Sequence, residues 1–258
     1  MIAGVGLHSG AGCRVHLHLD QGEIRFRRGG RYLPARLDHV VSSERSTVLG
    51  QDGLKVATVE HLLGALHVLG WWRGLVIEVS GDELPILDGS AAPWLEPLSD
   101  LGPPPAPPAP YLPRRSRSLR QGDSALTLTT GPTELCVEIE FMHPAIGRQR
   151  WCGAPERYRE VLDARTFGFL DEVESLRERG LAAGAGLENA IVFSGEEPLQ
   201  ALRHHDEPVR HKALDALGDF FLLGRPLAGR LQVVKGSHAA HIAFMKRLGE
   251  LTVRNSSS

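Results

Sequence analysis

Apolar and polar residues alternate in several short runs of this chain. In CRVHLHLD (13–20), Val15, Leu17 and Leu19 share one side while His16 and His18 share the other, which is the period of a strand. Further strands are predicted in the first half for EIRFRR (23–28) and GLVIEVS (74–80). In the second half they are predicted for SALTLTT (124–130), LCVEIEF (135–141), NAIVF (189–193) and RLQVVKG (230–236).

Four other segments have the spacing of helices, at about 58–69, 155–164, 208–223 and 239–249. Thr58 is the expected N-cap of the first, and Gly70 is its expected end. In the third, Pro208 suits the first turn, while Gly224 followed by Pro226 ends the helix.

The segment GPPPAPPAPYLP (102–113) divides the chain, because proline lacks the backbone N–H and fixes φ. We therefore predict an N-terminal domain over 1–102, a proline-rich linker over 103–113 and a C-terminal domain over 114–258. Strands followed by a helix occur twice, which indicates an α+β fold of two similar halves, each with a small, mostly antiparallel sheet. The tail RNSSS (254–258) is expected to be disordered.

Composition narrows the function classes. The chain has 258 residues, 42% of them hydrophobic, and 29 basic against 31 acidic side chains give a net charge of −2. This balance favours neither nucleic-acid binding nor a polybasic membrane patch. Cys13, Cys136 and Cys152 are odd in number and lack CxxC spacing, which indicates a reducing compartment and no disulfide framework. The start has no signal-peptide pattern and no run approaches 18 apolar residues, so a cytoplasmic protein without transmembrane segments is expected.

The helix predicted for 208–223 carries unusual polar residues. Its core stripe contains Leu214 and Leu217, but His211, Asp215 and Asp219 recur four apart on another stripe. Residues at i and i+4 lie one turn apart, so His211 and Asp215 can converge on one point and hold zinc. The alternative is a solvated helix face with an Asp–His hydrogen bond.

Glu60 and His61 begin the helix predicted for 58–69. If His61 is a third ligand, Glu60 points about 100° away and can instead reach a water near the metal. The alternative is an exposed acidic first turn. Three protein ligands with an open fourth position are typical of catalytic zinc. His238, which follows a strand, is a candidate acid for a leaving group.

Several runs together resemble one family, the zinc-dependent UDP-3-O-acyl-N-acetylglucosamine deacetylases of lipid A biosynthesis. They occur in the family's order and span nearly the whole chain: GVGLHSG (4–10), TVEHLLGAL (58–66), ELPILDGSAAPW (83–94), HPAI (143–146), ARTFGF (164–169), NAIVF (189–193) and RHKALDALGDF (210–220). The resemblance implies two similar halves with the helices sandwiched between two sheets.

The resemblance also implies roles for the matching positions. His61, His211 and Asp215 would bind zinc, with ferrous iron the alternative metal. Glu60 would be the general base for the attacking water.

His238 would be the general acid or electrostatic partner, oriented by Asp219, and Thr166 would stabilise the oxyanion. GLAAGAGLENA (180–190) matches the segment lining the family's acyl-chain passage. The implied substrate-binding residues are Phe167, which would pack on the substrate, Lys212, which would meet its diphosphate, Leu7 and Glu188.

The chain departs from the family pattern at a few positions. Only Met1 to Ala3 precede GVGLHSG, where the family usually has a strand. Glu188 stands where the family mostly has Asp. Ser237 replaces a Gly before His238, and His241 replaces an Asn three residues later.

The expected reaction is hydrolysis of an acetamide on an acylated UDP-N-acetylglucosamine, by a monomer. One alternative is a zinc hydrolase for another N-acyl sugar nucleotide. Another is an inactive homologue that binds the nucleotide sugar. The intact Glu60 and metal ligands favour an enzyme over the second alternative.

Overall fold

The computed structural model describes the backbone of residues 1–254 and the side chains of residues 1–249. The predicted disorder of the tail falls mainly on 255–258, outside the described residues. The helices are α1 (Glu60–Leu69), α2 (Leu95–Ser99), α3 (Val173–Glu178), α4 (Glu207–Phe221) and α5 (His238–Arg254).

Two five-stranded sheets have the same strand order, edge to edge. The first is β1 (Ile2–Val5), β2 (Gly12–Glu23), β8 (Arg73–Val79), β3 (Arg25–Arg28) and β4 (Arg31–Pro34). The second is β9 (Arg117–Gln121), β10 (Ser124–Thr129), β16 (Arg230–Val234), β11 (Glu134–Glu140) and β12 (Arg148–Gly153). In each sheet, the strand that comes last in the chain lies in the middle. In the first sheet β8 lies between β2 and β3 and pairs parallel with β3, and in the second β16 lies between β10 and β11 and pairs parallel with β11. All other pairs in the two sheets are antiparallel.

A three-stranded sheet and a helix precede that last strand in each half. In the first half they are α1 and the sheet of β5 (Val40–Ser42), β6 (Val48–Gln51) and β7 (Leu54–Val56). In the second they are α4 and the sheet of β13 (Phe167–Phe169), β14 (Ile191–Ser194) and β15 (Glu197–Pro198). The predicted α+β fold of two similar halves is therefore confirmed, and α1 and α4 occupy equivalent places.

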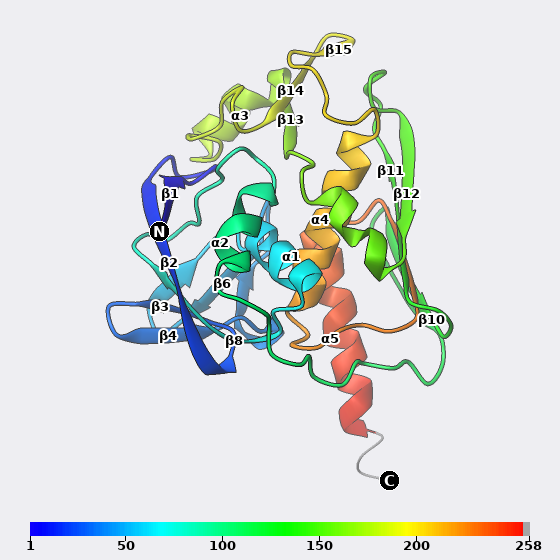
Figure 1. The fold of residues 1–258 in the computed structure, drawn as a ribbon. Helices are drawn as coiled ribbons and strands as arrows, with labels where there is room; N and C mark the ends of the chain where they lie inside the picture. Colours follow the sequence, from blue (N-terminus) through cyan, green and yellow to red (C-terminus); the bar gives the residue numbers. More distant parts are fainter. Residues whose placement is uncertain (255–258) are drawn as a thin grey trace.

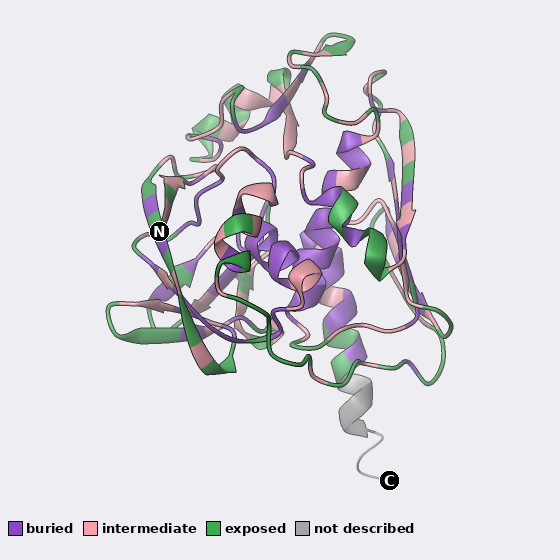
Figure 2. Ribbon diagram, viewed as in Figure 1, coloured by how far each residue is buried: buried purple, intermediate pink, exposed green. Residues whose placement is uncertain are grey.

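Helices α1, α4 and α5 lie between the two large sheets, as the resemblance implied, while α3 lies outside them beside β13 and β14 (Figure 1). Both α1 and α4 are coloured as buried along most of their length (Figure 2). Leu62 and Leu66 of α1 and Leu214 and Leu217 of α4 belong to one apolar core shared by both halves.

Glycine allows α1 and α4 to cross at very short range. A Cβ added at Gly218 would lie 2.0 Å from the carbonyl oxygen of Glu60, and one at Gly64 would lie 2.6 Å from Leu214 Cδ1. Any larger residue would force the helices apart. This crossing brings the polar residues of the two helices together.

Several local predictions were wrong. Thr58 does not cap α1, because its φ is +57° and its hydroxyl donates to Glu83 Oε1 at 2.9 Å. The predicted helix over 155–164 is a 3-10 helix, Pro155–Val161. His238, predicted to precede the helix at about 239–249, is instead its first residue. The chain begins with a four-residue strand, β1, whose last two residues are the first two of GVGLHSG.

The prediction of no disulfide was also wrong. Cys136 and Cys152 lie directly opposite each other on β11 and β12, with their Cα atoms 4.1 Å apart, and form a disulfide. Such spacing is typical of a non-hydrogen-bonded pair in an antiparallel ladder. The two cysteines meet because of the register of β11 and β12, and the spacing of cysteines along the sequence does not reveal that register. Cys13 is a buried free thiol.

Candidate active site

The three predicted metal ligands converge where α1 meets α4. His61 comes from the first turn of α1, and His211 and Asp215 come from successive turns of α4. Asp215 Oδ1 lies 3.3 Å from His211 Nε2 and 3.9 Å from His61 Nε2. All three side chains are buried, so the alternative of a solvated helix face is wrong.

These residues fit a divalent metal. One ligand atom from each of the three lies within 4.8 Å of the others. Burial, reinforced by the neighbouring His211, lowers the pKa of His61 to about 3, and burial also lowers the pKa of His211. Neutral imidazoles and a carboxylate are the forms that bind metal. His211 Nδ1 donates to the carbonyl of Ala164 at 3.0 Å, which leaves Nε2 to face Asp215.

Glu60 lies beside the three ligands without joining them. Its Oε2 accepts a hydrogen bond from the backbone N–H of Thr47 at 3.0 Å. Burial raises the pKa of Glu60 to about 7, and only 3% of the residue is exposed. A carboxylate with that pKa can both take up and release a proton near neutral pH. The alternative of an exposed acidic first turn is therefore wrong.

His238 faces Glu60 from the start of α5. Its Nε2 lies 3.9 Å from Glu60 Oε1, and its Nδ1 lies 2.8 Å from Asp219 Oδ2. Burial opposes the imidazolium, but the charges of Asp219 and Glu60 outweigh it and raise the pKa of His238 to about 10. The side chain is therefore a protonated imidazole held by a carboxylate.

Asp219 is fully buried and accepts several hydrogen bonds. Thr47 Oγ1 donates to its Oδ1 at 2.5 Å, and His241 Nδ1 donates to its Oδ2 at 2.7 Å. His241 thus shares with His238 the same carboxylate oxygen. Asp219, His238 and His241 also form a second group with metal-ligand spacing.

A cavity of about 380 Å³ opens onto this cluster. It is lined by the three predicted metal ligands, by Glu60 and His238, and by apolar side chains from several elements. The apolar lining comes mainly from segments 167–176 and 182–192, and includes Phe167, Phe169, Val173, Leu176, Ala182, Ala185, Ala190 and Val192.

The profile of one protein family, described as "UDP-3-O-acyl N-acetylglycosamine deacetylase", matches residues 1–250. The chain belongs to this family. A UDP-3-O-acyl-N-acetylglucosamine deacetylase of Thermosynechococcus vestitus is 38% identical over 97% of this chain and 92% of its own length. Those of Nitratidesulfovibrio vulgaris and Myxococcus xanthus are each 40% identical over 96% of this chain, and over 84% and 83% of their own lengths.

The structure places most residues implied by the resemblance to these deacetylases at the cavity. Leu7, Thr166, Phe167 and Lys212 line it. Lys212 Nζ donates to Asp215 Oδ2 at 2.7 Å and lies 5.7 Å from the centre of the Phe167 ring. Glu188 is exposed and lies outside the residues that line the cavity.

Sequence reasoning missed two residues of this deacetylase site. Thr47 bonds both Glu60 and Asp219, yet as a single Thr at the start of a strand it carried no signal. Glu83 accepts hydrogen bonds from the backbone of His8 and Ser9 and from Thr58, and so fixes the GVGLHSG loop at the cavity. Its position in ELPILDGS was the one available clue.

Among the helices of the described residues, none is both long and apolar enough to cross a membrane. The family members named above are deacetylases.

Proposed function

We propose that the chain hydrolyses the acetamide of UDP-3-O-(3-hydroxyacyl)-N-acetylglucosamine to a free amine and acetate, in lipid A biosynthesis. The chain is a deacetylase of this family. The observation that carries the mechanism is the buried group of His61, His211 and Asp215, flanked by Glu60 and His238 at the end of an apolar cavity.

His61, His211 and Asp215 would hold one divalent ion, which we propose is zinc, with ferrous iron as the alternative. Two imidazole nitrogens and a carboxylate oxygen suit either metal. When bound, the ion would supply a Lewis acid for the attacking water and the amide oxygen.

The proton transfers are assigned to the chain's own residues. Glu60 accepts a proton from the attacking water as its oxygen bonds to the acetamide carbon. Thr166 stabilises the oxyanion from the cavity wall. His238, held by Asp219, donates a proton to the nitrogen as the C–N bond breaks, so the products are acetate and the amine.

The cavity's lining suits an acylated substrate. The side chains of segments 167–176 and 182–192 are mainly apolar and would bury the fatty chain. We propose that Phe167 packs on the substrate and that Lys212, which the structure pairs with Asp215, meets the diphosphate. Leu7 would contact the substrate from the cavity wall, and Glu188, which the resemblance implies binds substrate, keeps that role only as a proposal.

The test is acetate release from the acylated UDP-N-acetylglucosamine by the purified protein. We expect turnover that a chelator abolishes and added zinc restores. Activity on a different N-acyl sugar nucleotide alone would support the first alternative. Binding of the nucleotide sugar without acetate release would support the inactive homologue. A monomer in the cytoplasm remains our prediction, to be checked by light scattering and fractionation.

A further inference from the structure

The first residue of α4, Glu207, has a fully buried carboxylate. The side chain of Glu207 is 0% exposed, and its oxygens accept four hydrogen bonds. Three come from Arg165, whose backbone N–H, Nε and terminal nitrogen lie 3.0, 2.9 and 3.1 Å away. The fourth comes from the backbone N–H of Arg203 at 2.6 Å. Buried charges persist in proteins only when they are fully paired in this way.

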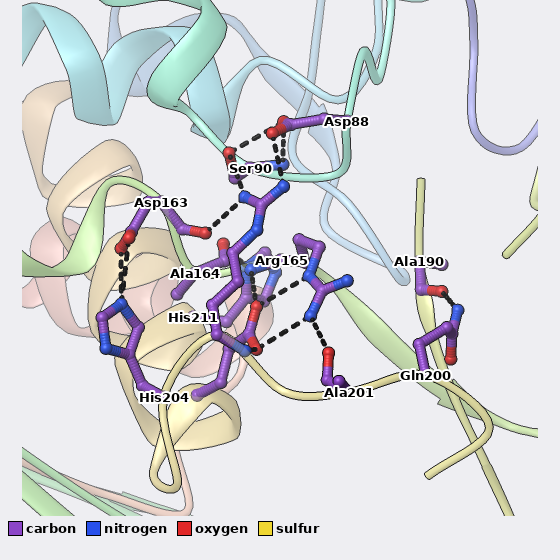
Figure 3. Close-up of polar contacts among 12 residues, drawn as sticks. Asp88, Ser90, Asp163, Ala164, Arg165, Ala190, Gln200, Ala201, His204 and His211 are labelled. Carbon is purple, nitrogen blue, oxygen red and sulfur yellow. Dashed lines mark hydrogen bonds and ion pairs between the residues drawn. The ribbon is translucent and has the colours of Figure 1, made fainter. Parts of the chain in front are cut away.

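The short segment that contains Arg165, residues 163–166, is held at several further points beside this pair. Arg165 also donates to the carbonyl of Ala201 at 2.8 Å, and Arg203 donates to the carbonyl of Asp163 at 2.7 Å. The next residue, Thr166, donates its backbone N–H to Gly89 at 2.7 Å. Figure 3 shows Arg165 and Ala164 side by side, with the His211 ring against them.

Helix geometry connects this segment to the metal ligands. Glu207 and His211 are four residues apart, one above the other on α4. Glu207 accepts from the backbone N–H of Arg165, while His211 Nδ1 donates to the carbonyl of the preceding residue, Ala164. One peptide unit is therefore held on both sides by one face of α4.

We infer that the Arg165–Glu207 pair is a positioning unit, which fixes the Ala164 carbonyl to orient His211 and places Thr166 at the cavity. This inference rests on the proposed metal site and extends it to residues outside the cavity. The pairing with Arg165 also lowers the pKa of Glu207, in spite of its burial, so the carboxylate is ionised at neutral pH.

The test compares zinc affinity, by competition with a chelator, in the full-length wild type and in Glu207→Gln. A direct partner of a metal-binding histidine is worth 10- to 100-fold in metal affinity or activity, and Glu207 acts through such a partner, the Ala164 carbonyl, so we expect a loss near the lower end, about 10-fold. The value of kcat should fall with it while KM changes little, because neither residue lines the cavity.

Asp206→Asn is the matched control. Asp206 is the residue next to Glu207 and pairs with Arg210 at 2.6 Å. The Asp206 and Arg210 side chains are buried to a similar extent as each other, and neither residue bonds to segment 163–166. Its zinc affinity should stay within about twofold of the wild type. His211→Ala, which removes a ligand, should abolish the site.

The outcomes separate the inference from the proposed function. If Glu207→Gln lowers the melting temperature but binds zinc as tightly as Asp206→Asn, the pair is only structural and the inference is overturned. If Glu207→Gln does not fold, zinc affinity is measured in Arg165→Lys instead. This variant keeps the positive charge but loses the bidentate hydrogen bond to the Glu207 carboxylate. A wild type that binds no zinc would overturn both the inference and the proposed function.

Discussion

Single residues at this site owe their chemistry to burial. Glu60 is a fully buried carboxylate with one backbone partner, so burial raises its pKa, whereas Asp219 is equally buried but has three donors and its pKa falls. Two acidic groups from neighbouring helices are thereby set to different tasks. Glu60 can exchange a proton, and Asp219 stays charged to hold His238.

Glu60→Gln should fold and keep its metal but lose activity. The change removes a base rather than a ligand, and a positioned base contributes roughly 100-fold or more. Metal content by elemental analysis and acetate release are the two measurements. Near-normal turnover would place the base elsewhere, with Asp219 the first residue to examine.

The pH dependence should report His238. Its pKa is raised from 6.5 to about 10, so the imidazolium persists through neutral pH and is lost as pH rises through about 10. A rate that needs this proton should therefore fall on the alkaline side near that value.

In His238→Ala the alkaline limb should flatten and the maximum rate should drop. His241→Asn, which restores the family's residue and keeps a side-chain N–H for Asp219, is the control and should retain the limb. An alkaline limb unchanged in His238→Ala would falsify the assignment and point to Lys212 or His241.

Among the elements, the contact between α1 and α4 decides whether a site exists. Each helix alone presents an incomplete set of polar groups, and the glycines at the crossing set the distance between the sets. The ends of α4 were predictable within two residues because Pro208 and Gly224 act locally. The start of α1 was also predicted within two residues, but its N-cap was not, since the left-handed backbone of Thr58 depends on Glu83, 25 residues away.

Gly218→Ala should weaken both stability and activity. The added Cβ would lie 2.0 Å from the Glu60 carbonyl oxygen, so α1 must move. Overpacking of this kind costs about 1–3 kcal/mol. Thermal unfolding and acetate release check it.

Gly249→Ala is its control. Gly249 also lies in a helix, but a Cβ there would have no atom within 4 Å among the described residues. Its melting temperature should be unchanged or slightly higher, because alanine favours a helix. Equal behaviour of the two variants would mean that the crossing tolerates a wider spacing.

The site itself was predictable only in part, for a physical reason. The i and i+4 spacing of His211 and Asp215 is a property of one helix, so the sequence contains it. Thr47 and the Arg165–Glu207 pair act across 13 to 172 residues of chain, and no local period signals them. The family resemblance supplied His61 and His238, which spacing alone could only suggest.

At the scale of the molecule, two halves with the same strand order share one core. Because Leu62 and Leu66 pack in the same cluster as Leu214 and Leu217, neither half is independent of the other. The domain limits 1–102 and 114–258 remain a prediction, and from the shared core we expect them to describe the path of the chain rather than separate folding units.

The chain should unfold in a single transition. If the halves unfold together, the calorimetric and van't Hoff enthalpies agree and one heat-absorption peak is seen. Differential scanning calorimetry of the metal-free protein measures this. Two resolved peaks would show that the shared core is too small to couple the halves.

The linker predicted at 103–113 has a consequence for how the proposed metal ligands stay together. His61 comes from one half and His211 and Asp215 from the other, so the ligand set exists only while the halves are docked. If the two halves were separate chains, the fraction of them docked together would fall as the protein was diluted. Residues 103–113 make it intramolecular, with an effective concentration on the order of millimolar for a short connection. A cell can thus keep this enzyme at very few copies without losing the site.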